Sequence, residues 1–128
     1  MDALVYSDGG KNNEKGCYGS FLVIADGEEK RKKEFTFSSA KTAPEAETLT
    51  LIEALTYIKH IDTQVPGRVN WEVALDAQWL FEHLTADRKR KVAKKFVQLI
   101  DQAKIIIDEY EIEISQVSGG IMKRILGH

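Results

Sequence analysis

Three carboxylates, each beside the end of an expected element, are the residues of this chain best suited to chemistry. Asp8 and Asp76 each end a short apolar run typical of a β-strand, and Glu47 lies in the first turn of a periodic helix. Carboxylates that project from such ends toward one point could hold Mg²⁺, since this hard cation prefers oxygen ligands. The three positions are therefore the first candidates for a metal and catalytic site.

Each carboxylate also has a structural explanation when it is taken alone. Asp8 could start a turn, Glu47 could complement the N-terminal dipole of a helix, and Asp76 could cap the helix that follows it. The occurrence of all three in this order, on three elements, favours one acidic site over three unrelated roles.

The composition is that of a single globular domain, spanning residues 1–128. The hydrophobic and charged fractions of 43% and 30% are ordinary, and the length is enough for one buried core. No apolar run approaches the roughly 20 residues of a membrane span, and the N-terminus lacks the pattern of a signal peptide. A single cysteine, Cys17, excludes an internal disulfide framework and a cysteine-based zinc cluster. We therefore expect a cytoplasmic protein with no membrane partner.

Charge is distributed unevenly along the chain, although the net charge of −2 does not by itself suggest nucleic-acid binding. Basic residues cluster at 30–33 and again at 88–91, continuing to Lys94 and Lys95, whereas acidic residues dominate 108–113. Either basic cluster could be a solvated face. A cluster that the fold places beside the carboxylates would instead be suited to binding phosphates.

The elements that must position the carboxylates can be predicted from periodicity and turn residues. Strands are expected at residues 3–7, 17–25, 29–38, 69–75 and 110–117. Helices are expected at about 44–60, 78–84 and 86–108. Turn-rich residues occupy 8–13, a loop occupies 62–70, and Gly119-Gly120 breaks the last strand before a short tail.

The resulting order, β-β-β-α-β-α-α-β, predicts an α/β fold. The first three strands are joined by short turns and should form an antiparallel meander. Helices separate the later strands, so these should be parallel. We therefore expect a mixed five-stranded sheet flanked by helices.

Three motifs in this order resemble those of the ribonuclease H family, over nearly the whole chain. Asp8-Gly9-Gly10, followed by the segment 16–19, resembles the family's first motif. Ala46-Glu47, with Ala54-Leu55 seven residues on, resembles the second, and Leu75-Asp76-Ala77-Gln78 resembles the third. Each motif alone is weak, but the three together with the expected elements between them are fairly specific.

The resemblance implies a nuclease that uses two metal ions to cut the RNA strand of RNA/DNA hybrids. Two ions about 3.5–4 Å apart can acidify an attacking water and neutralise the leaving oxygen. The resemblance assigns Asp8 as the bridging ligand, and Glu47 and Asp76 as ligands of the leaving-group metal. The cofactor would be Mg²⁺, with Mn²⁺ as a substitute, and the protein is expected to be a monomer.

The C-terminal segment departs from the family pattern. Family members carry a fourth acid there, but residues 118–128 contain no Asp or Glu. Ile125 falls roughly where the fourth acid belongs, with Gly120 or Ile121 in place of a mobile Glu or His. Lys123 or Arg124 could supply positive charge instead. His128 is either an uninvolved terminal residue or an unusual catalytic histidine.

Nucleic-acid contacts are expected around the first and third motifs and in the second basic cluster. The predicted contacts are Gly9, Gly10, Asn12, Asn13, Gln78, Arg88, Lys89 and Lys91. Ala43-Pro44 stands where many family members have two asparagines that reach the minor groove, so backbone groups would have to contact the sugars there. Trp79 is expected in the core rather than as a platform for base stacking.

Three functions remain open from the sequence. The first is a Mg²⁺-dependent ribonuclease H, favoured by the three acids. The second is a ribonuclease H-like module that binds nucleic acid or a protein without cutting, favoured by the tail that lacks an acid. The third is another nuclease of the same broad fold, such as a resolvase or an exonuclease.

Overall fold

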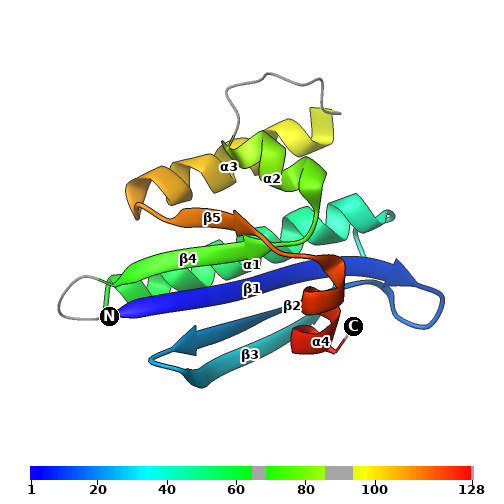
Figure 1. Ribbon diagram of the computed structural model, residues 1–128. Helices are drawn as coiled ribbons and strands as arrows, with labels where there is room; N and C mark the ends of the chain where they lie inside the picture. The colour runs from blue at the N-terminus through cyan, green and yellow to red at the C-terminus, as the bar shows by residue number, and fades with distance from the viewer. Residues whose placement is uncertain (65–68, 86–93, 128) are drawn as a thin grey trace.

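Five strands form one mixed sheet in the computed structural model, which describes residues 1–64, 69–85 and 94–127. The strand order across the sheet is β3-β2-β1-β4-β5 (Figure 1). In chain order the elements are β1 (Asp2–Asn12), β2 (Gly16–Ala25), β3 (Glu28–Thr36), α1 (Ala43–Asp62), β4 (Asn70–Leu75), α2 (Gln78–Thr85), α3 (Lys94–Glu109), β5 (Glu113–Gln116) and α4 (Gly119–Leu126).

The pairing of the strands confirms the predicted topology. β1 pairs antiparallel with β2, and β2 antiparallel with β3, as expected for strands joined by short turns. β4 pairs parallel with β1, and β5 parallel with β4. The fold is therefore the expected α/β sheet of three antiparallel strands followed by parallel ones.

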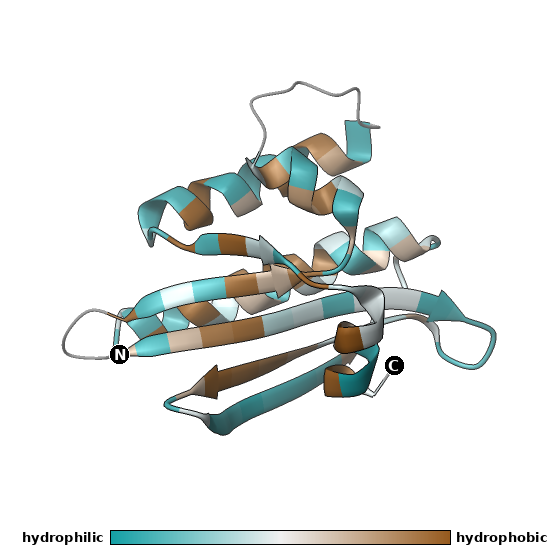
Figure 2. Cartoon of the chain, in the orientation of Figure 1, coloured by the Kyte–Doolittle hydropathy of each residue, from teal (hydrophilic) through white to brown (hydrophobic). Residues whose placement is uncertain are grey.

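Helix α1 covers one face of the sheet and builds the main core. Leu51, Leu55 and Ile58 of α1 are fully buried, as are Val5 of β1 and Val73 of β4. Figure 2 shows stretches of hydrophobic residues, in brown, along β1 and β4. On the described part of the chain, no helix has the length and apolar character to cross a membrane.

Helix α4 lies against the opposite face of the sheet (Figure 1). Its Met122 and Leu126 are buried against Leu22 of β2, in a second, smaller hydrophobic cluster. The short tail expected after Gly119-Gly120 is therefore mostly helical, which the sequence analysis does not predict. Ser118 caps the helix, because its Oγ accepts a hydrogen bond from the Ile121 N–H at 3.2 Å. Both glycines lie in the first turn of α4.

Strand β1 continues past the position where the sequence predicts its end. Residues 8–12, expected to form a turn, pair instead with residues 16–20 of β2. The turn shrinks to residues 13–15, and the Asn12 Oδ1 accepts a hydrogen bond from the Lys15 N–H at 2.6 Å. Gly16 follows with a φ of 66°, a conformation that favours glycine. Asp8 therefore lies within a strand rather than at its end.

The last elements are placed as expected but differ in length. β5 spans four residues rather than the eight predicted, and Glu111, with a φ of 50°, lies between α3 and this strand. α3 ends at Glu109, one residue beyond the expected end at Asp108. Its expected start at Ala86 lies outside the described residues.

The backbone of β1 passes unusually close to the start of α1. A Cβ atom built on Gly9 would lie 2.6 Å from the carbonyl carbon and oxygen of Ala46, and 2.7 Å from the Glu47 nitrogen. Real Cβ atoms do not make such contacts with backbone, so only glycine fits at this position. The contact brings Asp8, the residue before Gly9, beside the first turns of α1.

We predict that Gly9→Ala destabilises the protein by about 1–3 kcal/mol, because the added methyl group must push β1 and α1 apart. Thermal or urea unfolding followed by circular dichroism measures the change. Gly120→Ala is the matched control, since its Cβ would meet only the Ser118 Oγ at 4.0 Å. The control should unfold at or slightly above the wild-type temperature. A Gly9→Ala protein as stable as wild type would contradict the proposed steric constraint.

Candidate active site

The start of α1 is fixed by local sequence signals, and this places Glu47. Thr42 caps the helix, with its Oγ1 accepting a hydrogen bond from the Glu45 N–H at 3.4 Å. Pro44 lies in the first turn, where its missing N–H costs nothing. Ala46 is fully buried against the sheet, so the next residue, half-buried Glu47, emerges at the rim of the contact with Gly9.

The three predicted carboxylates line one small recess. Asp8 comes from β1, Glu47 from α1, and Asp76 from the residue that follows β4. The remaining lining residues are Ser7, Leu75, Ala77 and Leu80. Elements that are distant in sequence thus bring the three acids together, as the sequence analysis expects.

The electrostatic environment of Glu47 reflects this gathering. Burial above all, together with the neighbouring charges of Asp8 and Asp76, raises the pKa of the Glu47 carboxyl to about 7. A hydrogen bond from Trp79 acts in the opposite direction. Near neutral pH, without a cation, Glu47 is therefore divided between its protonated and ionised forms.

Trp79 has a role that the sequence analysis does not anticipate. Its Nε1–H donates a hydrogen bond to the Glu47 Oε2 at 3.2 Å, while its ring packs edge-on against Phe96 of α3 at 5.5 Å between centroids. The expectation that Trp79 contributes to the core is confirmed, since it packs against the main core cluster. The sequence does contain a signal for this role. Trp79 lies in the first turn of α2, which begins two residues after Asp76.

The donor types of the recess fit a hard divalent cation. Three carboxylates and no nitrogen or sulfur ligand form an oxygen-only set, which suits Mg²⁺ or Mn²⁺. Among the described residues, however, no three or more Asp, Glu, His or Cys side chains are already arranged so that they could hold a metal ion. Binding would therefore require the side chains of the recess to move together.

Helix α4 contains no acid and therefore supplies none to the recess. Gly119 approaches it, because a Cβ on this residue would lie 3.7 Å from the Asp76 Oδ2. Ile125, near the expected place of a fourth acid, instead packs against the cluster of Leu22, Met122 and Leu126. Lys123 and Arg124 are exposed, and His128 lies outside the described residues.

The predicted nucleic-acid contacts lie in different settings. Gly10 packs beside the Tyr18 hydroxyl in the β1–β2 hairpin, and Asn12 and Asn13 are exposed at the end of that hairpin. Exposed Gln78, at the start of α2, donates a hydrogen bond to the Glu82 Oε1 at 3.0 Å. The other predicted contacts, Arg88, Lys89 and Lys91, lie outside the described residues.

One basic residue of α3 is tied directly to the start of α1. The Lys95 Nζ lies 3.0 Å from the Glu45 Oε1. Glu45 is two residues from Glu47, and Lys95 follows closely on the basic cluster at 88–91. The described end of that basic region is therefore adjacent to the helix that carries a predicted ligand.

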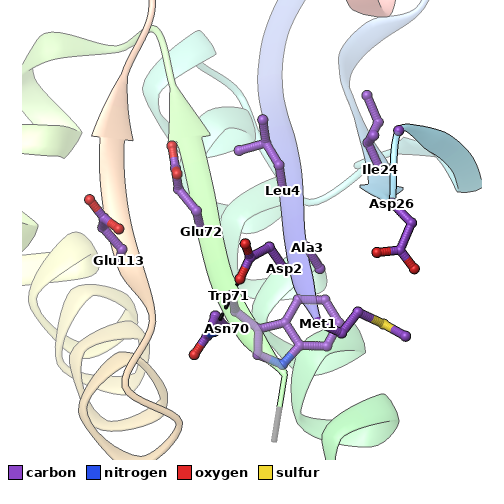
Figure 3. A pocket seen from close by; sticks show the side chains of 11 residues that line it. Met1, Asp2, Ala3, Leu4, Ile24, Asp26, Asn70, Trp71, Glu72 and Glu113 are labelled. Atoms are coloured by element: carbon purple, nitrogen blue, oxygen red, sulfur yellow. Dashed lines mark hydrogen bonds between the residues drawn. The ribbon is translucent and has the colours of Figure 1, made fainter.

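A larger cavity lies away from these residues. It has a volume of about 660 Å³ and is lined by the first residues of β1 and β4, including Asp2, Leu4 and Glu72, together with Glu113 of β5 (Figure 3). None of the predicted site residues lines it. Ligand sites of open α/β sheets lie beyond the carboxyl ends of parallel strands, whereas this cavity lies at the amino ends of β1 and β4.

We predict that the metal-free protein loses stability as the pH rises from about 4.5 to about 7. The pKa of Glu47 is higher in the folded than in the unfolded chain, so the folded state holds more protons over this range. The loss should be on the order of 1–2 kcal/mol, because solvent screens a half-buried group. Thermal unfolding in EDTA between pH 4 and 8 provides the measurement. Glu47→Gln should gain stability relative to wild type as the pH rises; a constant difference between the two proteins would refute this origin.

We predict that Trp79→Phe raises the pKa of Glu47 above 7, by less than about one pH unit, because the ionised carboxylate loses a hydrogen-bond donor. Carbon-13 NMR of the Glu47 carboxyl group during a pH titration measures it directly. Trp71→Phe is the matched control, since the Trp71 Nε1 donates to the Asp62 Oδ1 at 3.0 Å, outside the recess. An equal pKa in both variants would count against the Trp79 contact.

The fold has close counterparts among solved structures. A ribonuclease H1 from the halophilic archaeon Halobacterium salinarum matches with a TM-score of 0.81 and 20% identity, over 97% of this chain and 91% of that one. LC11-RNase H1 in complex with an RNA/DNA hybrid matches with a TM-score of 0.78 and 18% identity, over 95% and 89%. The N-terminal RNase H domain of Mycobacterium tuberculosis rv2228c matches with a TM-score of 0.79 and 17% identity, over 97% and 87%.

Comparisons of sequence alone gave no such counterpart. No protein-family model matches this chain, and no curated protein matches it significantly. Three-dimensional likeness at identities of 17–20% establishes a shared fold. A shared fold does not by itself establish a shared activity.

Proposed function

We propose that this chain, which has the ribonuclease H fold, is a metal-dependent nuclease that hydrolyses the RNA strand of RNA/DNA hybrids. The observation that carries the proposal is the recess in which β1, α1 and the end of β4 gather Asp8, Glu47 and Asp76. A similar fold in LC11-RNase H1, whose structure contains an RNA/DNA hybrid, supports the choice of substrate.

The three acids would hold Mg²⁺, or Mn²⁺ in its place. The bound metal would supply acidity to the attacking water and stabilise negative charge on the leaving oxygen. Glu47 must lose its proton to serve as a ligand. Burial and the charges of Asp8 and Asp76 raise its pKa, and a cation in the site would offset both effects. The Trp79 N–H favours the ionised form and holds Oε2, which leaves Oε1 available as a ligand atom.

Substrate would lie along the surface next to this recess. Gly9 and Gly10 offer backbone groups, while Asn12, Asn13 and Gln78 offer amides to the sugars and phosphates. Arg88, Lys89 and Lys91 would bind phosphates, as part of the basic region that ends beside α1. The Lys95–Glu45 ion pair supports that arrangement, because it joins this region to the helix that carries Glu47.

A second candidate function is a module that binds hybrids without cutting them. The observation that favours it is the absence of an acid on α4, whose Met122 and Leu126 are committed to the hydrophobic cluster on the sheet. A nuclease without this acid would have to work with three carboxylates, and oxygen atoms of the substrate phosphate would serve as further metal ligands.

We predict that Asp8→Asn lowers cleavage of a labelled RNA/DNA hybrid by at least about 100-fold, because a neutral amide cannot replace a ligand carboxylate. The purified proteins are incubated with Mg²⁺ or Mn²⁺ and hybrid, RNA duplex, DNA duplex or single strands. Cleavage of the hybrid alone would distinguish this activity from that of a resolvase or an exonuclease.

Asp2→Asn provides the matched control for this experiment. It makes the same change on the same strand, but Asp2 lies beside Asn70 at the opposite end of β1. The control should cut the hybrid like wild type. Hybrid binding by folded wild-type protein without any metal-dependent cleavage would reject the nuclease and leave the binding module.

A further inference from the structure

Ser7 carries a buried hydroxyl group without a hydrogen-bond partner. The residue is 2% exposed, and its Oγ is the one buried side-chain nitrogen or oxygen atom in the described ranges that has no partner. An unpaired buried hydroxyl costs its full desolvation, so such groups in folded proteins call for an explanation. A catalytic or binding role is one of the recognised explanations.

The position of Ser7 limits what its hydroxyl can reach. Ala3, Val5 and Ser7 alternate along β1 as buried residues on the face covered by α1. Ser7 also lines the recess, whose other lining side chains are either carboxylates or the apolar Leu75, Ala77 and Leu80. Among the side chains that line the recess, only the carboxylates can accept a hydrogen bond from Ser7.

Glu47 is the best placed of these acceptors. Asp8 follows Ser7 directly and, by the alternation of a strand, projects toward the opposite face. Asp76 lies beyond the end of β4, whereas Glu47 belongs to α1, the helix that covers the face on which Ser7 lies. A carboxylate has about four acceptor positions, so Glu47 can accept from both Trp79 and Ser7 and still ligate a cation.

We propose that Ser7 is a positioning residue, whose Oγ–H donates a hydrogen bond to the ionised Glu47 carboxylate when that carboxylate holds the metal. The inference rests on the proposed metal site. In this arrangement the Trp79 N–H and the Ser7 hydroxyl orient Glu47 from α2 and from β1. The hydroxyl is kept unpaired in the metal-free protein and finds its partner when the side chains of the recess move together.

The test compares Ser7→Ala with wild type in two measurements that need no substrate. Isothermal titration measures Mn²⁺ affinity, and thermal unfolding is followed in EDTA and in Mn²⁺. We expect Ser7→Ala to bind Mn²⁺ about 10-fold more weakly, as is typical when a group that orients a ligand is lost. In EDTA, the variant should unfold at the wild-type temperature or above it, because an unpaired hydroxyl has been removed.

Two further variants separate positioning from a general loss of a hydroxyl. Ser7→Thr keeps the hydroxyl and should retain most of the Mn²⁺ affinity. Ser115→Ala removes a hydroxyl that donates to the Glu72 Oε2 at 2.7 Å, away from the recess, and should leave Mn²⁺ affinity unchanged. A purely structural role for Ser7 predicts opposite results, with a lower unfolding temperature in EDTA and unaltered affinity.

The outcomes also distinguish this inference from the function on which it rests. Equal Mn²⁺ affinity of wild type and Ser7→Ala, with weaker binding by Asp8→Asn, overturns the role of Ser7 and retains the metal site. Absence of Mn²⁺ binding by folded wild-type protein overturns both, since Ser7 would then have no metal-holding carboxylate to orient.

Discussion

The contact between the backbone of β1 and the first turn of α1 is the constraint on which the rest of the site depends. At Gly9 the strand and the helix are too close to accommodate a side chain. The same helix meets β2 in a similar way, since a Cβ on Gly19 would collide with the Thr50 side chain. The two glycines pair across the hairpin, so α1 rests on a flat, side-chain-free strip of the sheet. Asp8 and Glu47 are held at the edge of that strip.

Close packing at this point makes the negative charge of Glu47 unfavourable in the free protein. Burial beside two other carboxylates raises the pKa of Glu47 to about 7, so the ionised form is costly in the free protein. A cation and the Trp79 hydrogen bond both favour the ionised form. The surroundings that disfavour the negative charge of Glu47 are thus those in which a bound divalent cation would offset the most repulsion.

The sequence predicts those parts of the molecule that depend on local patterns. The topology follows from the periodicity of the strands and helices and from the turn residues between them. Asp8 and Asp76 are found because they end apolar runs, and Glu47 because it lies in the first turn of the helix that Pro44 begins. Pairing across the sheet is not local, so the sequence pattern predicts a turn at residues 8–12, where β1 in fact continues. The same holds for α4, where Met122 is buried against Leu22 of β2, about a hundred residues earlier in the chain.

The supporting residues of the site were harder to predict for a related reason. The hydrogen bond from Trp79 of α2 to Glu47 of α1 joins residues 32 positions apart, so it forms only in the folded chain. Ser7 resembles any small residue of a strand until its burial and lack of a partner are known. Side chains that can bind a cation are therefore easier to identify from a sequence than the side chains that orient those ligands.

The parallel pairing of β4 with β1 has a consequence for the order in which this protein matures. The hairpins and α1 lie within the first 62 residues and contain both Asp8 and Glu47, so these two acids can meet before β4 is in place. Asp76 joins them only after a longer segment has crossed back to place β4 beside β1. Closing such a loop is entropically costly and belongs to the slower steps of folding. A nascent chain that is still lacking β4 would therefore hold two of the three acids, and the acidic site would be complete only once β4 has joined the sheet.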